Sequence, residues 1–128
     1  MRGEIRNKAY VQVNDFSQMR WGNITPTDLD AMLDFGNKLF VFIELKHGDA
    51  QMPYGQRLAL ERLVDAIESI PAYLLIASHN TTSEKDVNTA LATVTSYRYK
   101  KMWHIPQRAI TVKEAVNVIR ERELKEIL

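Results

Sequence analysis

Two short, mainly apolar stretches, 30–35 and 39–46, are separated by a glycine-containing turn, and together they predict a β-hairpin. Alternate side chains of a strand share a face. One face of the second stretch is therefore apolar, while the other ends in Glu44 and Lys46. The apolar face consists of Leu39, Val41, Ile43 and Leu45. Charges on such a hydrophobic strand are costly to bury unless they are paired, hydrogen-bonded or bound to metal, so this strand end predicts a functional site.

The pattern along the rest of the chain predicts alternating helices and strands. Residues 53–70 have the spacing of an amphipathic helix, and residues 73–77 form a short apolar run typical of a buried strand. Residues 93–104 are rich in β-branched and aromatic side chains and favour a strand, while residues 10–13 alternate only weakly. A capping box at 111–114 predicts a C-terminal helix. A helix between strands is the crossover that parallel pairing requires, so we expect an α/β fold with a central mixed sheet flanked by helices.

Length and composition narrow the class of protein. A chain of 128 residues with 45% hydrophobic and 26% charged residues is expected to form one globular domain, spanning residues 1–128. The lack of cysteine excludes a disulfide framework and a thiolate zinc site, and it suits a reducing cytoplasm. No apolar run approaches the roughly 18 residues that cross a membrane, and the N-terminus does not have the pattern of a signal peptide. We therefore expect a cytoplasmic protein without membrane association.

Charge is distributed unevenly along the chain, although the formal net charge is only +1. Residues 28–70 carry eight acids and four bases, whereas residues 97–113 carry five bases and no acid. This separation fits a metal site beside a surface that binds a polyanion, and it fits an ordinary solvated strand and loop equally well. The candidate nucleic-acid-binding residues are Arg98, Lys100, Lys101 and Trp103, with Arg20 upstream. Packing of the aromatic residues under the C-terminal helix is an equally good interpretation.

The hairpin brings together residues with a defined chemistry. Asp30 begins one strand and Glu44 lies near the end of its partner, close enough for their side chains to meet across the strands. Two converging carboxylates form an oxygen-rich site, which favours Mg²⁺ or Mn²⁺ over Zn²⁺. Lys46 shares the face of Glu44 and is placed to orient an attacking water or to stabilise negative charge in the transition state.

These residues also resemble a known family. The segment Pro-Thr-Asp-Leu-Asp at 26–30, followed 14 residues later by Glu-Leu-Lys at 44–46, is similar to the motif of the PD-(D/E)XK nuclease superfamily. That superfamily includes restriction endonucleases, archaeal Holliday-junction resolvases and many small phage nucleases. The resemblance covers roughly residues 20–80 and implies a restriction-endonuclease-like core.

The resemblance also implies roles for individual residues. Asp30 and Glu44 would bind Mg²⁺ or Mn²⁺ together with the backbone carbonyl of Leu45. Lys46 would be the catalytic lysine. Several members place a glutamine at the start of the next helix, and Gln56 matches that position, where it would hold the water or the lysine.

Further candidates are left open by the sequence. Asp28 points to the same face of an extended segment as Asp30, and Asp30 is preferred because it adjoins the apolar strand. Glu4 is a candidate for the additional acid that many members supply from an N-terminal helix. His79 follows a buried strand and would contact a phosphate or assist proton transfer, or else simply cap the strand end.

The combined pattern predicts a Mg²⁺-dependent endonuclease or exonuclease that acts on DNA, of the kind that phages carry for recombination, replication or packaging. Holliday-junction resolution is the leading specific hypothesis, and it requires a homodimer because two strands are cut symmetrically. A phage-encoded enzyme would act in the host cytoplasm. The alternatives are a catalytically silent nucleic-acid-binding or regulatory protein with the same fold, and a nuclease that acts on RNA or only within a larger complex.

Overall fold

The computed structural model describes residues 14–82 and 84–125. Over these residues the chain forms one five-stranded sheet, two α-helices and a short 3-10 helix. In chain order the elements are β1 (Ala31–Asp34), β2 (Phe40–His47), α1 (Tyr54–Ala66), β3 (Ala72–His79), η1 (Thr89–Leu91), β4 (Thr93–Tyr99), β5 (Met102–His104) and α2 (Val112–Leu124).

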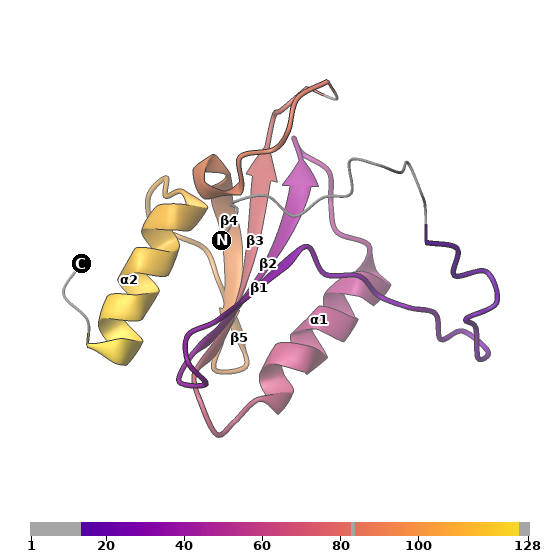
Figure 1. The fold of residues 1–128 in the computed structure, drawn as a ribbon, viewed down its shortest axis with the longest axis horizontal. Coiled ribbons are helices and arrows are strands. Elements are labelled where there is room, and N and C mark those ends of the chain that lie inside the picture. Colours follow the sequence, from indigo (N-terminus) through magenta and orange to yellow (C-terminus); the bar gives the residue numbers. More distant parts are fainter. Residues whose placement is uncertain (1–13, 83, 126–128) are drawn as a thin grey trace.

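The strands lie in the sheet in their order along the chain, β1-β2-β3-β4-β5. β1 and β2 form the predicted antiparallel hairpin, and β2 and β3 are parallel, with α1 as the crossover between them. β4 pairs antiparallel with both β3 and β5. Helices α1 and α2 cover opposite faces of this sheet (Figure 1). The predicted α/β class with a central mixed sheet and flanking helices is therefore confirmed.

Each face of the sheet packs against one helix. On the α2 face, Val41 and Ile43 of β2 belong to a cluster of buried residues that includes Ile119 of the helix. On the α1 face, Phe42 of β2 packs in a smaller cluster with Leu60 of α1. The alternation predicted for β2 is thus observed, and it divides the interior into two cores that we call the α2 core and the α1 core.

Helix α1 is shorter than the predicted helix over residues 53–70. Pro53 stands at its N-cap and the helix ends at Ala66, after which Ile67 adopts extended backbone angles, φ −88° and ψ 104°. Ile67 packs beside the α1 core from this extended position. Ile67 continues the helical spacing of apolar residues, but its side chain is needed for this tertiary contact and not for a longer helix. The predicted helix is therefore too long at its C-terminal end.

The single strand predicted over residues 93–104 is a hairpin of two strands, β4 and β5. Lys100 and Lys101 form its turn with positive φ angles of 51° and 62°. Two-residue hairpin turns of this kind normally contain asparagine or glycine. A lysine pair gives no such signal, so the pattern predicts a continuous strand.

The predicted capping box begins α2. The backbone N–H of Glu114 donates to the Thr111 hydroxyl over 3.2 Å, and the backbone N–H of Thr111 donates to the Glu114 carboxylate over 3.0 Å. Both groups would otherwise lack partners at a helix start.

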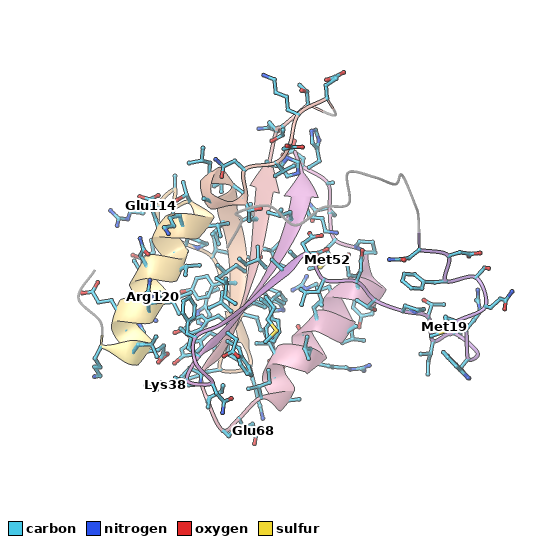
Figure 2. The ribbon with its side chains drawn as sticks, in the orientation of Figure 1. Met19, Lys38, Met52, Glu68, Glu114 and Arg120 are labelled. Carbon is cyan, nitrogen blue, oxygen red and sulfur yellow. The ribbon has the colours of Figure 1, made fainter. Side chains whose placement is uncertain are left out.

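The segment before β1 leads away from the sheet (Figure 1), and Met19 lies on its outlying part (Figure 2). Trp21 and Ile24 pair across the predicted turn at Gly22. The weak strand pattern at 10–13 lies outside the described residues. No helix in the described ranges is both long and apolar enough to cross a membrane.

Candidate active site

Asp30 and Glu44 meet at the end of the β1–β2 hairpin. The last paired positions of this hairpin are Ala31 and Ile43. Beyond them the backbone N–H of Leu45 donates to the Asp30 carboxylate over 2.7 Å, and the backbone N–H of Asp30 donates to Glu44 Oε1 over 3.3 Å. The Asp30 carboxylate thus accepts a hydrogen bond from the backbone N–H of Leu45, which lies beyond the start of β1 at Ala31. The same contact fixes its carboxylate beside Glu44.

Glu44 lies in the interior of the protein. It is 3% exposed, and it is the only charged residue among the described ones that is buried. Burial raises the pKa of Glu44, the hydrogen bond from Lys46 opposes that change, and the charge of Asp30 raises the pKa further. Lys46 offsets the charge of this carboxylate only in part, because the net effect of burial and of Asp30 is still a raised pKa. Such a position suits a group that binds a cation.

Lys46 and Gln56 surround the other oxygen of Glu44. Lys46 Nζ lies 3.2 Å from Glu44 Oε2 and donates to Gln56 Oε1 over 2.9 Å. The Gln56 amide nitrogen donates a short hydrogen bond to the same Glu44 oxygen. Gln56 stands in the first turn of α1, so the helix start holds both the lysine and the glutamate. The four side chains predicted from the sequence, Asp30, Glu44, Lys46 and Gln56, converge in one place.

The oxygen atoms of this cluster match the ligands that Mg²⁺ or Mn²⁺ takes in proteins. Mg²⁺ is usually held by one or two carboxylates, with water and substrate oxygens as its other ligands. Asp30 and Glu44 provide two carboxylates, while among the described residues no group of three or more acid, histidine or cysteine side chains is placed to hold a metal ion. The cluster therefore fits a hard divalent cation and lacks the nitrogen and sulfur ligands that Zn²⁺ favours.

Of the additional candidates that the structure describes, neither Asp28 nor His79 forms a hydrogen bond or ion pair with this cluster. Asp28 is exposed on the segment before β1, and Glu4 lies outside the described residues. His79 follows Ala77, which packs in the α2 core, so the strand alternation puts the histidine on the face opposite Glu44. Its ring lies 5.2 Å from that of His47, and its Nδ1 accepts from the backbone N–H of Thr81. These contacts correspond to the structural role considered for His79.

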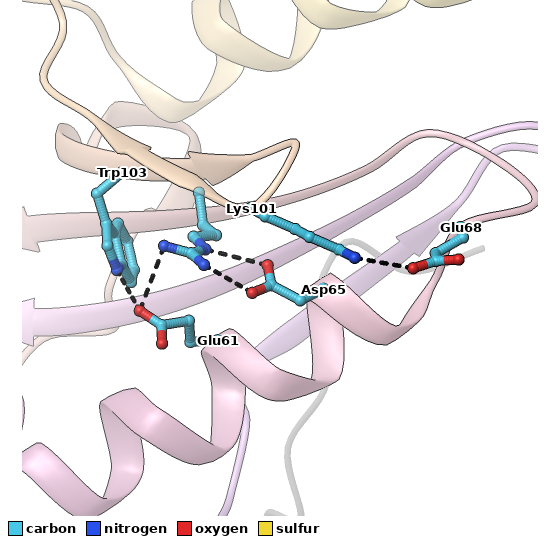
Figure 3. A network of polar contacts seen from close by, with 6 residues as sticks. Glu61, Asp65, Glu68, Lys101 and Trp103 are labelled. Atoms are coloured by element: carbon cyan, nitrogen blue, oxygen red, sulfur yellow. Dashed lines mark hydrogen bonds and ion pairs between the residues drawn. The ribbon is translucent and has the colours of Figure 1, made fainter.

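The predicted basic segment pairs with acids of α1 and of the residues just after it (Figure 3). Arg98 forms a two-pronged ion pair with Asp65, at 3.0 and 2.6 Å, and lies 3.4 Å from Glu61. The Trp103 indole donates to Glu61 over 2.6 Å, and Lys101 binds Glu68 over 2.9 Å. The acidic middle and the basic segment of the sequence thus neutralise each other in part. Binding of nucleic acid by Arg98, Lys101 and Trp103 stays a prediction.

The other two predicted basic residues also lie away from Glu44. Lys100 is in the β4–β5 turn, beyond the strand pairing of Tyr99 with Met102, and its ammonium lies 5.5 Å from the Tyr99 ring centroid. This turn is at the opposite end of the sheet from the carboxylates. Arg20 directly follows Met19 on the outlying segment (Figure 2) and donates to the carbonyl of Gly22 over 3.0 Å.

An open groove of about 490 Å³ adjoins Lys46 and was not predicted. Its wall includes Ser78 of β3, Ser96 of β4 and Trp103 of β5, and Arg57 of α1 lies on the same wall. The Arg57 guanidinium stands 4.8 Å from the centroid of the Trp103 ring. These residues come from four different elements, so no sequence spacing links them. The only available signal is that Arg57 directly follows Gln56.

Comparison of the chain with family models, curated proteins and solved structures finds no match in any of the three.

Proposed function

We propose that the protein is a metal-dependent nuclease with a restriction-endonuclease-like core and an active site formed by Asp30, Glu44, Lys46 and Gln56. The observation that carries this proposal is the burial of Glu44 in contact with a second acid, a lysine and a glutamine. The PD-(D/E)XK superfamily, which the motif resembles, places an aspartate, a glutamate and a lysine in this order, and several members add a glutamine at the start of the next helix.

The chain's own groups have separate roles in this mechanism. Asp30, Glu44 and the carbonyl of Leu45 would hold Mg²⁺ or Mn²⁺. When bound, the ion would polarise the scissile phosphodiester and lower the pKa of a water ligand. Lys46, fixed by Gln56, donates to the attacking water or to a non-bridging phosphate oxygen, where negative charge develops. The water adds to phosphorus and one P–O bond to the sugar breaks, which leaves a phosphomonoester and a free hydroxyl.

DNA is the proposed substrate, and a four-way junction is the specific form favoured by analogy with small enzymes of the superfamily. Symmetric cleavage of such a junction requires two active sites, hence a homodimer. The proposed place of action is the cytoplasm, which is the host's cytoplasm if the chain is phage-encoded.

Cleavage assays on defined DNA substrates test the proposal. Purified protein would be incubated with labelled linear duplex, single-stranded, flapped and four-way-junction DNA, each with Mg²⁺, Mn²⁺ or EDTA. We expect cleavage only with a metal, and we expect Glu44→Ala and Asp30→Asn to abolish it. Glu68→Gln is the matched control, because Glu68 is an exposed acid that lies beyond the C-terminal end of α1, away from the cluster.

Calorimetric titration with Mn²⁺ separates the alternatives. The proposed enzyme binds the ion through Asp30 and Glu44, so both substitutions should remove binding while Asp28→Asn retains it. A folded protein that binds DNA but neither binds Mn²⁺ nor cleaves any substrate would instead be the silent nucleic-acid-binding protein considered above.

A further inference from the structure

The groove beside Lys46 contains the cation of Arg57, which has no carboxylate partner among the described residues. Arg57 is exposed, and among the described residues its side chain contacts the Trp103 ring and no acid. Arg98 is different, because Asp65 and Glu61 already hold its guanidinium. A guanidinium that is held on an aromatic ring and still has free N–H groups is well suited to bind an anion.

The other residues of the groove complement a phosphate and a sugar. Lys46 lies at one end, next to the carboxylates, and Ser78 and Ser96 contribute hydroxyl groups to the wall. Asp49 is the one acidic residue among the described residues that line the groove. Lys46 is the residue that this groove shares with the candidate active site, and the wall that it belongs to is mainly basic and hydroxyl-bearing.

The groove is large enough to take one nucleotide. Its volume of about 490 Å³ is within the range that holds a ligand of ordinary small-molecule size. Bases that are not paired stack readily on aromatic rings and on guanidinium planes.

We propose that this groove binds an unpaired nucleotide next to the scissile bond, with its phosphate on Arg57 and its base against the Arg57–Trp103 pair. The inference rests on the proposed nuclease function and deepens it. It names the substrate class as DNA with unpaired nucleotides, such as a single strand or a flap, in place of the four-way junction suggested by analogy, and it identifies Arg57 as a specificity-determining residue.

Binding without metal tests the groove separately from catalysis. In EDTA, a short 5′-phosphorylated single strand with a fluorescent label would be titrated with protein, and its anisotropy compared with that of a duplex of equal length. We expect the single strand to bind more tightly. Arg57→Gln should weaken single-strand binding by about tenfold, because a charge-assisted contact is lost. Arg62→Gln, which removes an exposed charge from the same helix, should leave binding unchanged.

Tryptophan fluorescence gives a second measurement. The chain has two tryptophans, so Trp21→Phe leaves Trp103 as the only one. Addition of the single strand should change the Trp103 emission, and the change should disappear when Arg57→Gln is added. Equal binding by Arg57→Gln and the parent, or duplex binding as tight as single-strand binding, would overturn the inference.

The two proposals fail in different ways. Arg57-dependent binding in EDTA together with no cleavage in Mg²⁺ or Mn²⁺ would support nucleotide binding in the groove and contradict the nuclease function. Metal-dependent cleavage that is unaffected by Arg57→Gln and by base pairing would support the nuclease function and contradict nucleotide binding in the groove.

Discussion

The two faces of the sheet differ in chemistry although the same strands build them. On the α2 face, β2 contributes Val41 and Ile43 to a wholly apolar cluster of buried residues. On the α1 face, β2 contributes Phe42 and then the buried Glu44, followed by Lys46. A single strand therefore supports stability on one side and carries a charged cluster on the other.

Polar contacts follow the same division. Ion pairs of the α1 face link the helix to β4 and β5 through Arg98, Asp65 and Glu61. On the α2 side, the hydroxyls of Tyr73 and Tyr99 both donate to Glu123. Folding stability should accordingly depend more on the α2 core, and function more on the α1 face. The following substitutions test that division.

The largest expected effect is a loss of stability from the α2 core. Ile43 is 3% exposed, so Ile43→Ala should lower the free energy of unfolding by about 2–5 kcal/mol. Urea denaturation followed by circular dichroism measures this, with Ile43→Val as the conservative control at about 0.5–1.5 kcal/mol. Any activity should remain in the folded fraction at low temperature. Specific activity that falls with an unchanged unfolding midpoint would show that the two faces are coupled.

Lys46→Met tests the opposite face. Loss of a donor aimed at developing charge should reduce the cleavage rate by about 10²–10³-fold. Mn²⁺ binding should persist, because the carboxylates remain. The control is Lys38→Met, in the exposed β1–β2 turn, which should cleave normally. Single-turnover rates and calorimetry on the same samples distinguish catalysis from metal binding. A Lys46→Met protein that no longer binds Mn²⁺ would assign the lysine to organisation of the metal site instead.

The hairpin and the cluster at its end could be predicted because short-range patterns specify them. Alternation along β2 gives both faces, and strand pairing then brings Asp30 to Glu44. Gln56 could be placed because a turn of helix begins soon after the strand. Each of these inferences needs only local geometry and one adjacent element.

Features that depend on distant contacts could not be predicted. Arg98 and Asp65 are 33 residues apart and meet only because α1 packs over β4. The sequence gives their opposite charges without showing that they neutralise each other. The same limit applies to Arg57 and Trp103, whose contact forms part of the groove wall.

The ion-pair network gives a smaller effect that separates structure from binding. The Arg98 side chain is 13% exposed, so Arg98→Met should destabilise the protein by about 1–3 kcal/mol through the loss of its charged partners. Lys101→Met breaks a pair that is mostly exposed and should leave the free energy of unfolding almost unchanged. Urea denaturation and DNA-binding titrations check both. Weakened DNA binding by Arg98→Met at full stability would support the nucleic-acid role predicted from the sequence.

The smallest expected effect is a pH dependence of stability caused by Glu44. Because burial and Asp30 raise the pKa of Glu44 in the folded protein, the folded state holds a proton that the unfolded state has already lost. The free energy of unfolding therefore falls as the pH rises from the ordinary glutamate pKa through the raised one. The side chain in the Glu44→Gln variant cannot ionise, so its free energy of unfolding does not fall for this reason. Its melting temperature should equal that of the parent in acid and exceed it at higher pH.

Thermal melts of both proteins across the pH range, without metal and then with Mg²⁺, complete the comparison of the faces. A bound cation compensates the charge of Glu44, so Mg²⁺ should raise the melting temperature of the parent and leave that of Glu44→Gln unchanged. A difference between the two proteins that is constant with pH would mean that Glu44 titrates alike in the folded and unfolded states. Lys46 and Gln56 would then compensate the charge of Glu44 by themselves, and the α1 face would need no bound cation for that purpose.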